Sequence, residues 1–327
     1  MPIFDPQTTQ LIKDWDQTIE TQIKIKRITT DHPEENQFIN FADQMSGITS
    51  RLVIETEKGE KGLPCLLLKE NITYSALPLE KELEPFFEAL SQINDKNLIL
   101  PDQIKQDLDK IDIPVQLKLY IALQCPHCPN VVRTVMPLAL YCKNISFHII
   151  DGSLFPKTAQ KDGVMSAPCL ILDDDFRWTG SVQPQEIIKM ITDRDPSQLS
   201  AGTLKTILEQ GDAAWITQAM IKNKGIFDAF FKLLLHETWS VRLGAMVIVE
   251  ELAETDPGLA ASLGPVLTNL FDEKDVPIQG DILYALGEAG DLETKKWIQT
   301  KLPELEHPDL IDAAKDALDS LKTKLAT

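Results

Sequence analysis

The sequence predicts an α/β region built from two similar units, followed by an all-helical repeat region. Three observations support this fold class. Apolar residues alternate between a period of 3.6 and a period of 2 up to about residue 196, which indicates helices packed on a sheet. The order of helices and strands is similar before and after residue 106. Beyond residue 197 only the helical period remains.

The first unit, residues 1–106, should contain three helical stretches and four strands. Each is bounded by a change in period or by turn-forming residues. In chain order we expect a helix at about 6–20, a strand at 22–28, a helix around 38–45, strands near 51–56, 64–69 and 72–75, and a helix at 79–93.

The second unit, residues 107–197, should have a similar order. Its first strand, 114–123, is apolar nearly throughout, as expected for a central strand buried on both faces. We expect a helix at 101–109, this strand, a helix ending at 141, a strand at 145–150, a short helix, a strand at 167–172, a hairpin turn at 173–175 and a helix at 184–192.

The third region, residues 198–327, shows an internal repeat of 35 residues. The repeated apolar positions are Val241, Val276 and Ile311, and, seven residues further on, Ile248, Leu283 and Leu318. Such a period predicts stacked helix pairs that bury a shared core. The alternative is an irregular helical bundle. The tryptophans of this region are expected to pack between helices: Trp215, Trp239 and Trp297.

The charge balance excludes some partners. The 327 residues include 32 basic and 50 acidic side chains, a net charge of −18, and no basic cluster stands out. Nucleic acids and acidic membrane surfaces are therefore not expected as partners. No apolar run approaches the ~20 residues that cross a bilayer. Because no signal sequence is visible at the N-terminus, we expect a cytoplasmic protein.

Five cysteines lie within the first 169 residues: Cys65, Cys125, Cys128, Cys142 and Cys169. An odd and sparse set is not typical of a secreted disulfide framework. It indicates a reducing compartment and one special pair, in the motif Cys125-Pro126-His127-Cys128. We expect the other three cysteines to pack in the core.

The Cys-Pro-His-Cys motif falls between a buried strand and a helix. With Cys125 as the N-cap and Cys128 at the third helical position, both sulfurs would lie on the first turn. Pro126 would fit the first helical position, where an N–H is not needed. The helix N-terminus, helped by His127, would favour a thiolate at Cys125. Cys125 would then attack a disulfide, and the more buried Cys128 would resolve the mixed disulfide.

Two other interpretations of the motif are a zinc site and an inert pair. Zinc takes about four ligands, usually from two pairs. The further candidate ligands, Cys142, Cys169, His127 and His148, are not paired in the sequence. Redox chemistry is therefore favoured, and we predict no bound metal and no cofactor.

Residues 6–196 resemble the N-terminal domain of the alkyl hydroperoxide reductase flavoprotein subunit. The resemblance lies in the stretches Cys125–Val132, Ile150–Phe155 and Val164–Pro168. It implies two tandem thioredoxin-like folds, of which only the second carries a Cys-x-x-Cys pair. Glutaredoxin-like protein disulfide oxidoreductases share this tandem but usually keep a pair in both halves. In the resembled family the pair accepts electrons from a flavin domain and passes them to a peroxidase.

The resemblance also implies a role for Pro168. In thioredoxin folds a cis-proline begins the strand beside the redox pair and offers backbone to an extended peptide. The alternative is a plain proline at a strand start. Pro64 has the equivalent place in the first unit, but no cysteine occurs in the stretch after that unit's first strand, Thr29–Glu34. The first unit is therefore expected to be a redox-silent copy.

The chain departs from this family after residue 197. It contains no Gly-x-Gly-x-x-Gly fingerprint for a dinucleotide, and its helical repeats resemble HEAT-type repeats in period. Electrons should therefore come from, or go to, another protein, such as a peroxiredoxin or a separate reductase. The Pro-His dipeptide matches that of the oxidising DsbA type, so the direction of electron flow stays open.

These observations predict a thioredoxin-like protein disulfide oxidoreductase whose helical repeats recruit a protein partner. Its expected site residues are Cys125, Cys128, Pro168, Pro126 and His127. The alternative, from a different functional class, is a helical-repeat scaffold whose thioredoxin-like unit serves mainly for docking.

Overall fold

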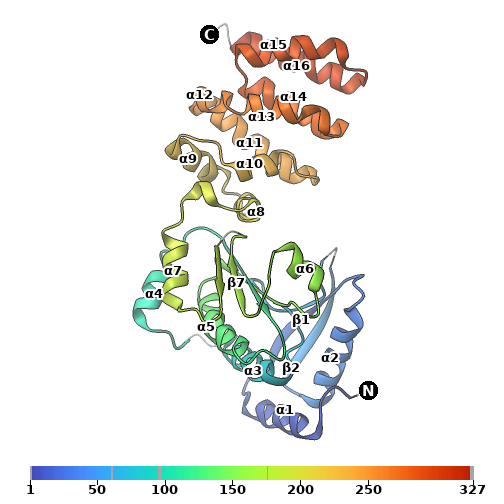
Figure 1. Cartoon of the computed structure of the whole chain (residues 1–327), viewed down its shortest axis with the longest axis vertical. Helices are drawn as coiled ribbons and strands as arrows, with labels where there is room; N and C mark the ends of the chain where they lie inside the picture. Colours follow the sequence, from blue (N-terminus) through green and yellow to red (C-terminus); the bar gives the residue numbers. More distant parts are fainter. Residues whose placement is uncertain (1, 60–61, 95–97, 175, 325–327) are drawn as a thin grey trace. The chain divides into compact units, whose positions relative to one another are not determined.

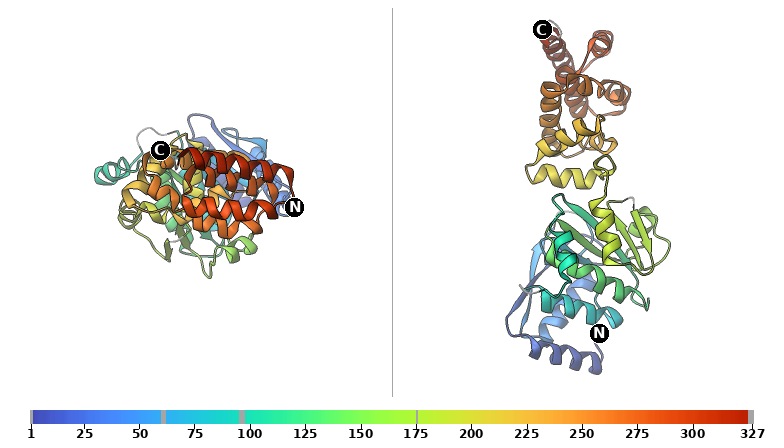
Figure 2. Two further views of the ribbon diagram at one scale, coloured as in Figure 1. Left: turned by 90° about the horizontal axis from the view of Figure 1, so that it is seen from above. Right: turned by 90° about the vertical axis from the view of Figure 1, so that its left-hand side faces the viewer.

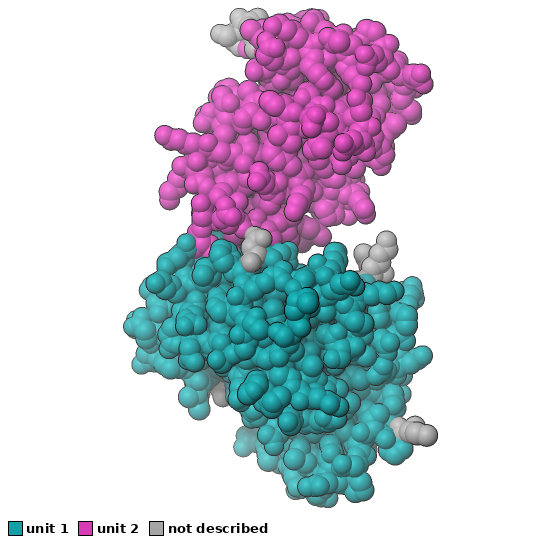
Figure 3. Space-filling view, in the orientation of Figure 1, with its two compact units in different colours: residues 1–193 teal, residues 194–327 magenta. Residues whose placement is uncertain are grey.

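A computed structural model describes residues 2–59, 62–94, 98–174 and 176–324. The chain divides into two compact units, unit 1 (1–193) and unit 2 (194–327), which are coloured separately in Figure 3. Our domain boundaries at 106/107 and 197/198 remain predictions. Asp175, part of the predicted turn at 173–175, lies outside the described residues.

Unit 1 contains helices and strands close to those expected from the sequence. In chain order they are α1 (Pro6–Thr18), β1 (Ile23–Thr29), α2 (Glu35–Ile48), β2 (Leu52–Lys58), β3 (Cys65–Lys69), β4 (Ile72–Ser75), the 3-10 helix η1 (Glu80–Glu82), α3 (Leu83–Gln92), α4 (Asp102–Leu108), β5 (Val115–Ile121), α5 (Cys128–Tyr141), β6 (Ile145–Asp151), α6 (Pro156–Lys161), β7 (Cys169–Leu172), β8 (Phe176–Thr179) and α7 (Pro184–Thr192).

The strands of unit 1 form one eight-stranded sheet in the order β2-β1-β3-β4-β6-β5-β7-β8. The two halves of this order are equivalent, because β2-β1-β3-β4 repeats as β6-β5-β7-β8. In both halves the first two strands are parallel and the other neighbours are antiparallel. A parallel pairing of β4 with β6 joins the halves. The carboxyl ends of β1 and β5 therefore lie at the same edge of the sheet.

The joining of the halves also brings helices from both together. Helix α3 packs against α5, so the two lie side by side (Figures 1 and 2). The core under these helices is continuous through both halves and includes Phe86 and Leu119, which are fully buried. The first half therefore contributes directly to the surroundings of the motif that precedes α5.

Strand β5 differs from the expectation of burial on both faces. Val115, Leu117 and Leu119 are buried, but Gln116 is half-buried and the Lys118 side chain is 26% exposed. Lys118 forms ion pairs with Asp162 and Asp174 at this second face. The prediction is wrong for this part of the second face, because Gln116 and Lys118 alternate with the apolar residues and the charged end of Lys118 is paired at the sheet surface.

Helices are the only regular secondary structure among the described residues of unit 2. Its helices are η2 (Pro196–Gln198), α8 (Ala201–Glu209), α9 (Ala213–Asn223), α10 (Asp228–Leu234), α11 (Trp239–Thr255), α12 (Pro257–Ala261), α13 (Gly264–Leu270), η3 (Phe271–Glu273), α14 (Val276–Ala289), α15 (Leu292–Lys301), η4 (Leu302–Glu304) and α16 (Pro308–Lys324). Helices α9, α11, α14 and α16 pack successively against one another. None of the described helices is long and apolar enough to span a membrane.

The tryptophans of unit 2 have different surroundings. The Trp297 ring packs edge-on against Phe271 with centroids 5.4 Å apart, as expected for a residue between helices. Trp239 is 60% exposed, so the packing prediction was wrong for this residue. It lies at the first position of α11, where the helix start leaves its side chain uncovered.

Candidate functional site

The cysteine motif connects β5 to α5 at the carboxyl edge of the sheet. Helix α5 begins at Cys128, with His127 as its N-cap, two residues later than the sequence predicted. Pro126 therefore does not take the first helical position, and Pro129 lies at the second one instead. Either proline suits a helix start, where the missing N–H removes no hydrogen bond, so the sequence did not distinguish between them.

Cys125 is half-buried and lies against two backbone groups. Its Sγ accepts the N–H of Cys128 at 3.2 Å, and this is one of the free N–H groups of the first turn of α5. The same Sγ lies 3.6 Å from the carbonyl oxygen of Ala167, to which a thiol can donate. The first contact stabilises negative charge on the sulfur, and the second ties Cys125 to the loop before β7.

Cys128 is fully buried behind Cys125. Burial raises the pKa of the Cys128 thiol, and the neighbouring Cys125 and the carboxyl group of Glu82 raise it further. Both sulfurs are free thiols in this structure. One half-buried sulfur just before the helix and one fully buried sulfur at its first residue is the arrangement expected for an attacking and a resolving cysteine.

Pro168 lies beside this pair. The peptide bond between Ala167 and Pro168 is cis, which confirms the expectation from the sequence. Pro168 directly precedes β7, which pairs with β5 so that Cys169 faces Tyr120. The Ala167 carbonyl that contacts Cys125 therefore belongs to the cis peptide itself.

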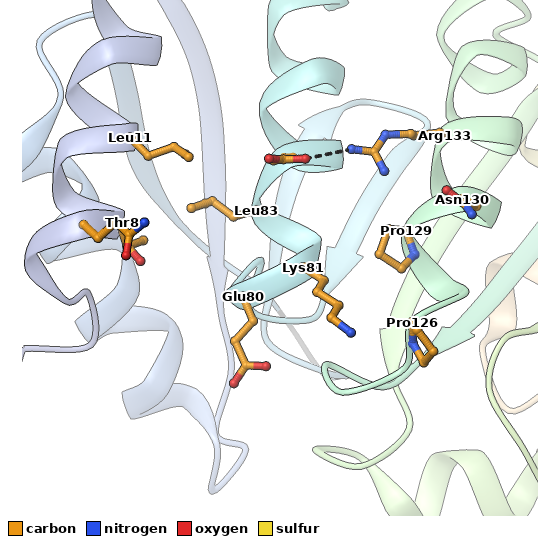
Figure 4. Close-up of a pocket in the computed structure, with 11 residues that line it drawn as sticks. Thr8, Leu11, Glu80, Lys81, Leu83, Pro126, Pro129, Asn130 and Arg133 are labelled. Atoms are coloured by element: carbon orange, nitrogen blue, oxygen red, sulfur yellow. Dashed lines mark hydrogen bonds and ion pairs between the residues drawn. The ribbon is translucent and has the colours of Figure 1, made fainter.

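Pro126 and His127 are exposed at the tip of the motif. The His127 side chain makes no capping hydrogen bond to α5. Pro126 lines a cavity of about 450 Å³, shown in Figure 4, together with residues from α1, η1, α3 and α5. Figure 4 labels Thr8, Leu11, Glu80, Lys81, Leu83, Pro126, Pro129, Asn130 and Arg133 around this cavity.

The structure places a further ionisable residue at the site, Glu82, which we did not single out from the sequence. It is fully buried, and burial raises the pKa of its carboxyl group to about 7. The hydroxyl group of Tyr74 lies 3.5 Å from Oε2. Oε1 has no hydrogen-bond partner among the described residues. Glu82 is close enough to Cys128 for its charge to raise the pKa of that thiol.

A sequence signal for Glu82 did exist. Leu79, Glu82, Phe86 and Leu90 recur at helical spacing, so Glu82 occupies an apolar face at the start of α3. An acidic residue near a helix start is normally a favourable partner of the helix dipole. Only the packing of α3 against α5 distinguishes this buried carboxyl from an exposed one.

The equivalent loop of the first half carries no sulfur. Glu35 accepts the N–H of Thr30 at 3.1 Å and forms an ion pair with Arg27, which fixes this loop without a cysteine pair. Cys65, Cys142 and Cys169 are buried, as expected for core residues. Among the described residues, no three His, Cys, Asp or Glu side chains come together as metal ligands.

Known proteins of similar sequence and structure support this view of unit 1. Residues 115–192 match the sequence family described as the thioredoxin domain. The N-terminal domain of the alkyl hydroperoxide reductase AhpF from Enterococcus faecalis (V583) superimposes with a TM-score of 0.51 at 17% identity, over 57% of this chain and 99% of that one. A protein disulfide oxidoreductase from Aeropyrum pernix K1 superimposes with a TM-score of 0.53 at 13% identity, over 61% and 97%.

Unit 1 is a tandem thioredoxin-like fold. Its second half, which matches the thioredoxin-domain family over residues 115–192, carries the Cys125–Cys128 pair, and the all-helical unit 2 follows. Two curated relatives, both 21% identical to the chain, have different names. One is an NADH dehydrogenase from Bacillus subtilis (strain 168), aligned over 92% of this chain and 58% of its own length. The other is the alkyl hydroperoxide reductase AhpF from Pseudomonas aeruginosa, aligned over 64% and 42%. The chain thus spans about half the length of these relatives.

Proposed function

We propose that the chain is a thiol–disulfide oxidoreductase that acts on disulfides or dithiols of other proteins through Cys125 and Cys128. One observation supports this proposal most strongly. The half-buried Cys125 sulfur lies between a free N–H of α5 and the carbonyl group of a cis peptide, with Cys128 buried behind it. This geometry presents one sulfur to a substrate and withholds the other until a mixed disulfide has formed.

Reduction of a substrate disulfide would take two exchange steps. The Cys125 thiolate attacks one substrate sulfur, the substrate S–S bond breaks, and the other substrate sulfur leaves as a thiolate that takes up a proton. Cys128 then loses its proton and attacks Cys125 Sγ. This releases the second substrate sulfur and leaves a Cys125–Cys128 disulfide, so two electrons have passed to the substrate. Oxidation of a substrate dithiol runs the same steps in reverse.

Glu82 is the proposed proton acceptor for Cys128. The thiol of Cys128 is buried, so it needs a nearby base to become a nucleophile. Glu82 has a pKa of about 7 and an oxygen with no hydrogen-bond partner among the described residues, which suits a group that takes and returns a proton near neutral pH. Because Glu82 lies in the first half of unit 1, the redox-silent half would supply the acid–base group of the active half.

Pro168, Pro126 and His127 are proposed to act through position. Pro168 would offer the backbone of its cis peptide to an extended substrate segment. Pro126 and His127, both exposed, would set the environment of Cys125 and the redox potential of the pair.

The source or acceptor of electrons is proposed to be a separate protein, a peroxiredoxin or a reductase, by analogy with the peroxide-reducing relatives. Unit 2, with its HEAT-like period, would recruit it in the cytoplasm.

The proposal is tested by dithiothreitol-dependent reduction of insulin disulfides with the full chain. We expect activity to be lost in Cys125→Ser and to persist in Cys142→Ser, a matched change of a buried cysteine outside the motif. Cys128→Ser should hold a mixed disulfide on Cys125 that mass spectrometry can identify. Full activity of Cys125→Ser would contradict the proposal and would favour a scaffold in which unit 1 serves only for docking.

A further inference from the structure

A row of large apolar side chains is exposed on α11. Trp239, Leu243 and Val247 are 60%, 45% and 47% exposed, and their spacing of four residues places them on one face of the helix. Tyr284 of α14, which is 44% exposed, borders this row, since its hydroxyl group donates to Glu250 Oε1 on α11 at 2.6 Å. Four large apolar or aromatic side chains therefore form one exposed patch.

The exposure of this row contrasts with the opposite face of α11. Val241, Ala245, Ile248 and Leu252 of the same helix are at most 6% exposed. The row therefore lies on the side of α11 that the neighbouring helices leave uncovered. Contiguous exposed apolar patches of this kind mark interaction surfaces.

The same face of α11 continues into acidic residues. Glu250 and Glu254 follow Val247 at helical spacing, and the last turn of α11 contains no basic residue. The carboxylate of Glu254, in the last turn, is unfavourably placed, because that end of the helix carries a partial negative charge. A bound cation would relieve this arrangement.

The basic residues of α11, α14 and α16 do not supply such a cation. Helices α11, α14 and α16 together carry nine acidic and four basic residues. Each of the four basic residues is already paired with an acid of these helices, in the ion pairs Arg242–Asp281, Lys315–Asp312, Lys322–Asp319 and Lys324–Glu288. Of the five remaining carboxylates, that of Asp309 lies 3.8 Å from His307 Nδ1. The other four, those of Glu250 and Glu254 among them, have no ion pair within the described part of the chain.

We propose that this surface, the α11 face (Trp239, Leu243, Val247, Tyr284, Glu250 and Glu254), binds a basic amphipathic helix of a partner protein. Apolar residues of that helix, spaced by three to four positions, would cover the apolar patch. Its Lys or Arg residues would pair with Glu250 and Glu254. A second copy of this chain fits poorly because each copy carries a net charge of −18. The inference rests on the partner recruitment proposed above and gives it a location.

The probe is a synthetic amphipathic peptide of about 18 residues, or five helical turns, with Leu on one face and Lys on the other. A second peptide has Glu in place of every Lys. Calorimetric titration of the full chain should show binding of the basic peptide only. Trp239→Ala should weaken it by about thirtyfold, as for an aromatic side chain that carries much of the binding energy. Glu250→Gln with Glu254→Gln should weaken it by about fivefold, as for two exposed ion pairs.

The matched control is Glu293→Gln with Glu306→Gln, which removes the same charge from exposed positions outside α11 and α14 and should leave binding unchanged. Insulin reduction should be normal in all α11-face variants, and Cys125→Ser should still bind the peptide, so failure of this inference is distinct from failure of the proposed function. Equal binding of both peptides, or equal loss in the control, would overturn it. So would self-association of the chain that Trp239→Ala abolishes, since a second copy would then cover the face.

Discussion

The buried carboxyl group of Glu82 should make the stability of unit 1 depend on pH. Its pKa is about 7 in the folded protein, against an ordinary value of 4.5, because burial disfavours the charged form. At pH values between 4.5 and about 7, the Glu82 carboxyl group keeps its proton in the folded state and has lost it in the unfolded state. Stability therefore falls as the pH rises through this window. From pH 5 to pH 8 the cost amounts to about 2.5 kcal/mol of unfolding free energy.

The substitution Glu82→Gln removes this titration. The difference in unfolding free energy between Glu82→Gln and the wild type should therefore move by about 2.5 kcal/mol in favour of the variant from pH 5 to pH 8. All five cysteines lie in unit 1. Urea unfolding of this unit in the reduced full chain can thus be followed by the reaction of its buried thiols with 4,4′-dithiodipyridine.

The matched control is Glu80→Gln, which changes an exposed carboxyl group two residues earlier on η1. Its difference from the wild type should be nearly constant with pH. A constant difference for Glu82→Gln as well would refute the reasoning, because it would mean that Glu82 ionises as readily in the folded protein as in the unfolded one.

Three further predictions concern the site and unit 2. Glu82→Gln should slow the resolution of a mixed disulfide at pH 7 by about a hundredfold, the usual effect of losing a general base, as measured by rapid acid quench. Tyr74→Phe removes the hydroxyl that stabilises the charged Glu82, so the pKa of Glu82 should rise further, shifting the pH midpoint of the stability change upward. Gly287→Ala should destabilise unit 2 by about 1–3 kcal/mol in thermal unfolding, because a Cβ there would lie 2.8 Å from Ala317 Cα. Gly280→Ala is the control on the same helix. A Cβ there would meet open space, so this change should stabilise unit 2 by up to about 1 kcal/mol.

The order of elements and the redox pair could be predicted from local features of the sequence. An apolar strand, a cysteine motif and an amphipathic helix follow one another within a short stretch, and each has its own period or turn signal. The cis peptide at Pro168 could be expected from the resemblance, because it recurs in folds with this motif. The helix start could not be fixed, since both Pro126 and Pro129 suit a first turn.

The remaining parts of the site depend on long-range pairing. Glu82 reaches Cys128 only because β4 pairs with β6 and brings α3 against α5, and no sequence period specifies which strand edges will pair. The exposure of Trp239 also depends on packing between segments that are distant in the sequence. Its sequence context is that of a packed helix, and only the uncovered face of α11 distinguishes it from Trp297.

The central claim is that Cys125 and Cys128 form a reversible two-electron couple. The most direct measurement is equilibration of the full chain in glutathione buffers of graded potential, followed by acid quench, alkylation and peptide mass analysis. We predict a single transition in which a Cys125–Cys128 disulfide replaces two alkylated thiols, while Cys65, Cys142 and Cys169 stay reduced. The absence of this disulfide at every potential, or a transition that persists in Cys125→Ser, would contradict the account.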